Sequence, residues 1–173
     1  MTMRKGFAEG ELCWTDLQTR DVEAAKAFYA GVFGWRYEDL PSPDGRSYAK
    51  AFLGDDLVTV LAPQNPQQEA AAEPGRWNVY FAVDDARDLA AELAHSPGHL
   101  EFGPEEIGDT GVMVFFAPPG GGTTGAWQAG SHVGAGRSQE AGTLAWAELL
   151  TPEPQAAVVL GVFGHVVPEK LLE

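Results

Sequence analysis

The sequence predicts an α+β fold built from paired βαβββ modules, and two observations carry this prediction. Residues 10–34 and 142–164 repeat one strand–helix pattern, and each copy ends with the phrase Gly-Val-Phe-Gly. Residues 10–63 and 75–130 share a longer pattern of one strand, one helix and three further strands. A single strand–helix unit cannot bury its apolar face alone, so each unit needs a neighbour to pack against.

The first module, residues 10–63, opens with a strand and a helix. Residues 11–18 alternate between the two faces of a strand, and Asp21 then begins a helix that Gly34 ends. The apolar side chains that we expect on the inner face of this helix are Val22, Ala25, Phe28, Tyr29, Val32 and Phe33. The three strands that follow are predicted at residues 35–38, 47–53 and 57–62.

The second module, residues 75–130, follows a linker over residues 64–74 that has no sheet pattern. Residues 77–83 predict a strand, and residues 84–94 predict an amphipathic helix with Leu89 and Leu93 turned inward. Three more strands are predicted near residues 99–102, 112–117 and 125–128.

Outside the two modules we expect a flexible leader over residues 1–9 and a second linker over residues 131–141. Residues 142–173 form a truncated third module, a strand over residues 142–151 followed by a helix that Thr151 caps. The strand and helix match those of the first module, but the three strands that would complete a module are missing.

Composition limits the class of protein. The chain of 173 residues is 45% hydrophobic, which indicates a globular protein, and it has no run long enough to span a membrane and no signal-peptide pattern. Its single cysteine, Cys13, excludes an intramolecular disulfide. The formal net charge of -14 argues against nucleic-acid binding and suits a cationic ligand, although acidic surfaces also serve solubility alone. We therefore expect a cytoplasmic protein.

Three phrases of the chain resemble the vicinal oxygen chelate superfamily of glyoxalase I, bleomycin-resistance proteins and extradiol dioxygenases. They lie at residues 14–29, 32–35 and 77–85. The resemblance implies that the modules form a half-open mixed β-barrel, the glyoxalase/bleomycin-resistance fold, with a divalent metal in its concavity. The likeness is closest to actinobacterial members with four modules in two tandem domains, here truncated in the second domain.

The metal ligands that the resemblance implies do not have their counterparts here. The first-strand positions are Trp14 and Asn78, and the last-strand position of the second module falls near Gly125. The fourth position lies in residues 57–63, which contain no His, Asp or Glu. Tryptophan, glycine and aliphatic side chains cannot coordinate a divalent ion, and a lone amide is a weak ligand. We expect no metal and no cofactor.

Histidines do not replace these ligands. His95 and His99 have the spacing of a helical metal pair, but Pro97 and Gly98 break any helix between them, which favours a solvated loop. His132 and His165 have no evident second ligand. The acidic residues Glu105, Glu106 and Asp109 are also expected in a solvated loop.

Strand parity places Asp16 on the same face as Trp14. There Asp16 could act as a general base or hold a cation, and equally it could cap the turn into the helix. Tyr80 and Trp127 add aromatic surface on the later strands, and Trp127 is expected near the rim. Such side chains suit a planar ligand, although Trp14 could equally plug the barrel.

The leading hypothesis is a metal-free protein that sequesters a small aromatic or cationic compound at Trp14, Asp16, Asn78, Tyr80 and Trp127. The alternative is an isomerase, lyase or oxygenase-like enzyme of secondary metabolism, metal-independent or with a divalent metal, for which Asp16 is a weak catalytic candidate. A remnant without any ligand is a third reading. Because the strand at residues 142–151 lacks its own partners, we also expect a homodimer with residues 142–165 at or across the interface.

Overall fold

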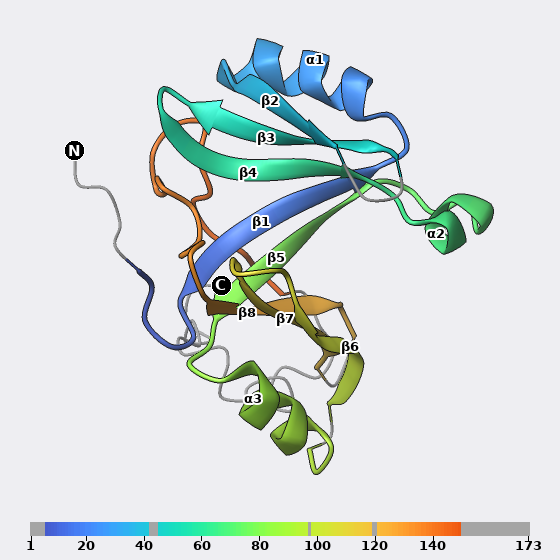
Figure 1. The fold of residues 1–173 in the computed structure, drawn as a ribbon, viewed down its shortest axis with the longest axis vertical. Coiled ribbons are helices and arrows are strands. Elements are labelled where there is room, and N and C mark those ends of the chain that lie inside the picture. Colours follow the sequence, from blue (N-terminus) through green and yellow to red (C-terminus); the bar gives the residue numbers. More distant parts are fainter. Residues whose placement is uncertain (1–5, 42–44, 97, 119–120, 150–173) are drawn as a thin grey trace, which may run out of the picture. The chain divides into compact units, whose positions relative to one another are not determined.

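The computed structural model describes residues 6–41, 45–96, 98–118 and 121–149. Eleven helices and strands follow one another in the order β1 α1 β2 β3 β4 α2 β5 α3 β6 β7 β8 (Figure 1). The described chain divides into two compact units, whose boundaries fall within β1 and β5. Unit 1 comprises residues 14–79 and 134–147, and unit 2 comprises residues 6–13, 80–133 and 148–149.

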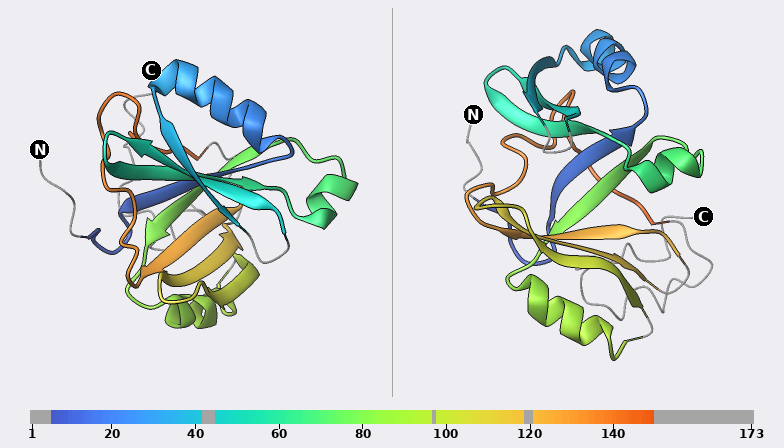
Figure 2. Two further views of the ribbon diagram at one scale, coloured as in Figure 1. Left: turned by 45° about the horizontal axis from the view of Figure 1, so that its top comes forward. Right: turned by 45° about the vertical axis from the view of Figure 1, so that its right-hand side comes forward.

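Unit 1 holds the first module. Its elements are β1 (Leu12–Thr19), α1 (Val22–Phe33), β2 (Arg36–Pro41), β3 (Ser47–Leu53) and β4 (Asp56–Pro63). The strands have the order β2-β3-β4-β1, in which β1 runs parallel to β4 and the other neighbours are antiparallel. α1 packs against the core of this sheet (Figure 2). The predicted order of strand, helix and three strands is confirmed.

The ends of α1 lie where the sequence predicts them. The Asp21 side chain caps the helix and accepts a hydrogen bond from the backbone N–H of Ala24 at 2.8 Å. Gly34 ends the helix in the left-handed conformation, with φ of 71°, which glycine adopts without strain.

The predicted inner face of α1 is only partly correct. Val22, Ala25 and Tyr29 pack against the core, whereas Phe28 and Val32 are 61% and 55% exposed. Phe33 is also exposed and stacks on Tyr29, with 5.7 Å between the ring centroids. The six-residue apolar face is therefore wider than the part of α1 that the sheet covers.

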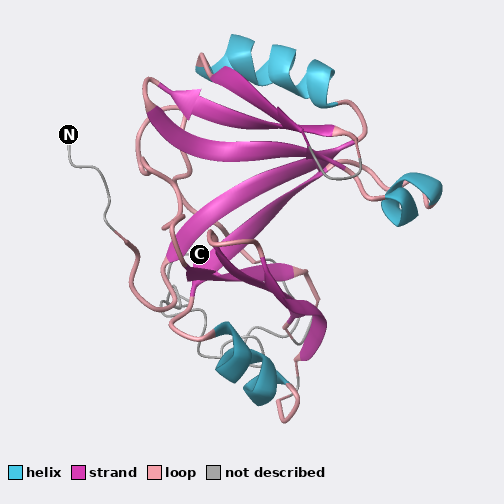
Figure 3. Cartoon of the chain, viewed as in Figure 1, coloured by secondary structure: helices cyan, strands magenta, loops and turns pink. Residues whose placement is uncertain are grey.

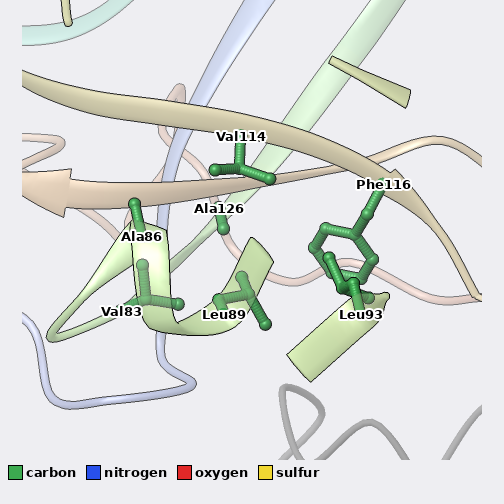
Figure 4. Close-up of a cluster of buried hydrophobic side chains, with 7 residues drawn as sticks. All are labelled: Val83, Ala86, Leu89, Leu93, Val114, Phe116 and Ala126. Carbon is green, nitrogen blue, oxygen red and sulfur yellow. The ribbon is translucent and has the colours of Figure 1, made fainter. Parts of the chain in front are cut away.

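Unit 2 holds the second module. Its elements are the second half of β5 (Arg76–Ala82), α3 (Ala86–Leu93), β6 (His99–Glu106), β7 (Gly111–Ala117) and β8 (Thr124–Ala129). The strands have the order β5-β8-β7-β6, with β5 parallel to β8 (Figure 3). Leu89 and Leu93 of α3 pack against Val114, Phe116 and Ala126 of the sheet, which confirms their predicted inward orientation (Figure 4).

Two connecting segments are anchored to unit 1. The predicted linker over residues 64–74 contains a short helix, α2 (Pro66–Ala70), which a reciprocal pair of hydrogen bonds between Asn65 and Gln68 caps. Residues 134–147 are held by the ion pair of Arg137 and Asp56 at 2.6 Å. The Trp35 indole N–H also donates to the carbonyl of Gly142 at 2.8 Å.

The strand expected at residues 142–151 does not form in the described part of that segment. Residues 142–149 contribute only an isolated bridge between Leu144 and Ser138. A strand needs a continuous partner to satisfy its backbone groups, and the described neighbours supply one bridge only. Thr151, Pro152 and His165, with the helix predicted there, lie outside the described residues. Among the described helices, none is both long and apolar enough to cross a membrane.

Candidate functional site

In unit 1, β1 and the first half of β5 bring together three of the five predicted site residues. Trp14 and Asp16 lie two residues apart on one face of β1, opposite Leu17, which packs in the core beneath α1. The Asn78 side-chain amide donates to the Asp16 carboxylate at 2.7 Å. Trp14 is 7% exposed and Asn78 is 4% exposed, while Asp16 is half-buried.

The structure bears on one of the two predicted roles of Asp16, the cap of the turn into α1. The cap of α1 is Asp21, whose backbone N–H in turn donates to the Thr19 hydroxyl at 3.3 Å. Asp16 lies in the middle of β1, so the prediction that it could cap the turn is wrong. A carboxylate can accept several hydrogen bonds, so the bond from Asn78 does not by itself exclude a donor or cation on a ligand.

The residues at the family's ligand positions do not fit a divalent metal. Trp14 offers no acceptor, and the carbonyl oxygen of the Asn78 amide, whose NH2 group donates to Asp16, is a weak ligand when alone. On β4, the residue opposite Asp16 is Val60. A Cβ added at Gly125 would lie 2.3 Å from the Tyr80 ring, so this ring fills the space that a longer side chain would need.

No group of three or more His, Cys, Asp or Glu side chains within the described ranges is arranged to hold a metal ion. His95 and His99 are both exposed, and His95 follows the end of α3 while His99 begins β6. The pair is therefore not on a helix. Glu105, Glu106 and Asp109 are exposed as well. The predicted loop is correct for Asp109 only, because Glu105 and Glu106 end strand β6, where Glu106 forms an ion pair with Arg87 at 2.6 Å.

Cys13 is not a candidate nucleophile. The side chain is fully buried, and its thiol donates to the carbonyl of Tyr80 at 3.3 Å. Burial raises the pKa of the thiol to about 12, so it stays neutral at physiological pH. Because the thiolate is the reactive form, this cysteine is inert.

In unit 2 the structure buries the other two predicted site residues. Tyr80 is 3% exposed, its hydroxyl donates to the Met113 sulfur at 3.6 Å, and its ring lies 5.3 Å from that of Phe115. Trp127 is 6% exposed, and its indole N–H donates to the carbonyl of His132 at 2.9 Å. Both aromatic residues are held by specific partners.

Trp127 also lines a cavity of about 170 Å³ in unit 2, which we call the Phe7–Trp127 cavity. Its lining residues are Phe7, Ala82, Val83, Asp84, Trp127, Gln128, Ala129 and Val133. Sequence reasoning singled out Trp127 alone among these residues. Phe7 lies in the expected flexible leader, and Val133 lies in the expected linker, where no periodicity marks a side chain as buried.

Comparison with known proteins agrees with the fold. The sequence profile of the glyoxalase/bleomycin resistance protein/dioxygenase superfamily matches residues 12–123. A relative in Mycobacterium tuberculosis, the protein CFP32, which carries a glyoxylase name, is 40% identical over 159 residues. The alignment covers 91% of this chain and 60% of CFP32. This chain therefore spans only part of the length of that relative.

A second relative is the anthracycline biosynthesis protein DnrV of Streptomyces peucetius, with 32% identity over 155 residues, covering 84% of this chain and 56% of DnrV. Among solved structures, the Mn(II)-bound glyoxalase of Novosphingobium aromaticivorans is similar with a TM-score of 0.55 and 18% identity, covering 90% of this chain and 52% of that one. Methylmalonyl-CoA epimerase of Mycobacterium tuberculosis has a TM-score of 0.51 and 14% identity, covering 74% and 93%.

At these identities the two solved structures support the fold alone. The predicted α+β fold and the predicted family are confirmed by the profile match and by the relatives. The chain belongs to the glyoxalase/bleomycin resistance protein/dioxygenase superfamily.

Proposed function

We propose that the protein is a metal-free binding protein that sequesters an aromatic or cationic small molecule in the cytoplasm. The observation that carries the proposal is the hydrogen-bonded pair of Asp16 and Asn78. Of these two residues, Asn78 stands at a first-strand position that the family resemblance assigns to a metal ligand, and Trp14 stands at the other. Trp14 shares a face with Asp16, and its indole is the aromatic side chain that we propose to contact the ligand. A ligand that carries both an aromatic ring and an amine matches these three side chains. In unit 2, we propose Tyr80 and Trp127 as contacts for a ligand that binds separately from the pair of Asp16 and Asn78.

Two further facts support this ligand class. The net charge of -14 attracts cations to the protein as a whole. The superfamily name includes bleomycin resistance proteins, and one relative is named for anthracycline biosynthesis. Both names associate similar proteins with bulky antibiotics, and anthracyclines combine an aromatic system with an amine.

A second candidate function follows from the same relative. A protein named for biosynthesis suggests an enzyme of secondary metabolism, an isomerase, lyase or oxygenase-like protein, with Asp16 as general base. Turnover of an anthracycline precursor by the purified protein, lost in Asp16→Asn, would favour this enzyme. Binding without turnover would favour sequestration.

The first prediction tests the proposed site with daunorubicin, an anthracycline that carries an amine, by fluorescence titration. We expect binding by the native protein and an affinity at least ten-fold lower for Asp16→Asn, since the substitution removes the charge but keeps the shape. Asp109→Asn, an equal change of charge at an exposed loop, should leave the affinity unchanged.

The metal-free part of the proposal is tested in the same titration. Daunorubicin affinity should stay the same when EDTA is present. Equal affinities of the native protein and Asp16→Asn would contradict the proposed site, and loss of binding with EDTA would contradict a metal-free mode.

We also propose that the protein is a homodimer with residues 142–149 at the interface. Members of the superfamily are often dimers. Trp146 is 80% exposed in the segment that Gly142 attaches to Trp35, and Phe33 of α1 is exposed in the same unit. Together they leave apolar surface that a second copy can cover.

The second prediction is that Trp146→Ser shifts the dimer toward monomer in light scattering. The side chain is exposed in the single chain, so the substitution should not disturb the fold. Ile107→Ser, which removes a 40% exposed side chain in unit 2, is the control and should leave the dimer intact. A dimer equally stable in both variants would show that Trp146 lies outside the interface.

A further inference from the structure

We infer that the Phe7–Trp127 cavity of unit 2 is a second ligand site, which takes a single-ring organic cation. The inference goes beyond the proposed function, because it assigns a different place, a different ligand size and a different carboxylate. It requires no binding at Asp16.

The size of the cavity suits a ligand with a single ring. An apolar protein cavity of about 150 Å³ accommodates a benzene molecule, so the volume of about 170 Å³ is enough for one six-membered ring with a short substituent, in a lining that here exposes more polar than apolar surface. A fused polycyclic compound is larger than this volume and would extend into solvent through the open side of the cavity. The cavity is therefore a poor site for an anthracycline and a suitable site for a small aromatic amine.

The residues that line the cavity favour a positively charged ligand. Phe7, Trp127 and Val133 supply apolar contacts, and the faces of aromatic rings attract positive charge. Asp84 is the charged member of the lining and is exposed, which places a carboxylate where the cavity meets solvent. Among the described residues that line the cavity there is no lysine or arginine, so these residues offer no positive charge to an anionic ligand.

Neighbouring residues strengthen this preference. Glu9 accepts a hydrogen bond from the backbone N–H of Asp84 and so adds a second carboxylate close to the first. Backbone hydrogen bonds from Asp88 and Arg87 hold the pKa of Asp85 below its usual value, so this carboxylate is charged as well. The Arg87 guanidinium is paired with Glu106 on β6.

The cavity is held in shape by hydrogen bonds. The indole of Trp127 is fixed by its bond to the carbonyl of His132, and the backbone N–H of Val83 donates to the carbonyl of Trp127 at 3.0 Å. The segment after Phe7 is paired with β5 by two bonds of 2.8 Å, from Gly10 to Ala82 and from Ala82 to Glu11. A site that exists before binding costs less ordering when a ligand enters.

Benzylamine, a single ring with a protonated amine, is the probe. Titration into the native protein, followed by NMR of the tryptophan indole N–H groups, should shift the Trp127 resonance, which the variant Trp127→Phe identifies by its loss. Phenylacetate, a similar ring with a negative charge, should cause no saturable shift. Absence of a benzylamine shift at Trp127, or equal binding of phenylacetate, would overturn the inference.

Variants test the contacts. Asp84→Asn should weaken benzylamine binding about five-fold, because the carboxylate is partly screened by solvent, and Phe7→Ala should weaken it through loss of one apolar contact. Asp88→Asn, an equal change of charge on α3 outside the lining, should have no effect. An unchanged affinity in both Asp84→Asn and Phe7→Ala, with backbone spectra that show an intact fold, would place the probe elsewhere.

The same variants separate this site from the site at Asp16. Asp16→Asn should retain benzylamine binding at Trp127, and Asp84→Asn should retain daunorubicin binding. If daunorubicin does not bind at Asp16, the proposed cavity site is not contradicted. Loss of benzylamine binding in Asp16→Asn would overturn the cavity as an independent site.

Discussion

Replacing Trp14 with alanine is expected to lower the free energy of unfolding by about 3–5 kcal/mol, the range for truncating a buried tryptophan. Trp14 is 7% exposed within β1, and the substitution would leave a void that the neighbouring strands cannot close fully. Urea denaturation followed by circular dichroism measures the change.

The internal repeat provides a matched control. Trp146 occupies the position of Trp14 in the second copy of the pattern, but it is 80% exposed. Trp146→Ala should therefore change the free energy of unfolding of the monomer, measured below the concentration at which the protein dimerises, by less than about 0.5 kcal/mol. The same substitution at matching positions thus separates the effect of burial from that of residue type.

The result also separates the two readings of Trp14. A cost of several kcal/mol makes the residue part of the core. A small cost together with lost daunorubicin binding would make it a ligand platform with little structural role. Normal stability together with normal binding would contradict both readings.

The sequence predicts best those structural features that depend on residues close together in the chain. The cap at Asp21 and the left-handed Gly34 are local features, and both lie where the sequence predicts them. The inner face of α1 is less predictable, since periodicity shows which side chains are apolar but not how much of the helix the sheet covers. Phe28 is exposed for this reason.

The same limit applies to the candidate site. Strand parity places Trp14 and Asp16 on one face and selects Asn78, but the hydrogen bond between Asp16 and Asn78 depends on how separate strands are placed. The Phe7–Trp127 cavity needs Phe7 and Val133, which lie in connecting segments without periodicity. When two residues are far apart in the sequence and lie outside helices and strands, no periodicity in the sequence predicts that they will be in contact.

The region around Gly125 shows a different limit, because a glycine in a sequence does not reveal what fills the space beside it. Here the Tyr80 ring lies against the position that a Cβ at Gly125 would take, with its Cδ1 atom 2.3 Å away. Tyr80 and Gly125 are also register partners on the parallel strands β5 and β8. The two residues therefore form a large–small pair that must change together.

A double-mutant cycle tests this pairing. Tyr80→Ala should cost about 3–5 kcal/mol of unfolding free energy, since the ring is 3% exposed and packs against Phe115. Gly125→Ala in the native background should cost about 1–3 kcal/mol through overpacking. In the Tyr80→Ala background the same glycine substitution should cost nothing or restore stability, which gives a large coupling energy.

Gly31→Ala is the control for the glycine substitution itself. A Cβ at Gly31 meets nothing within 4 Å, and the residue lies inside α1, so alanine should stabilise the protein by up to about 1 kcal/mol. Opposite signs at Gly31 and Gly125 would attribute the cost at Gly125 to the Tyr80 ring. Additive effects of Tyr80→Ala and Gly125→Ala would instead show that the ring moves aside freely, and a longer side chain at position 125 would then be possible on this fold.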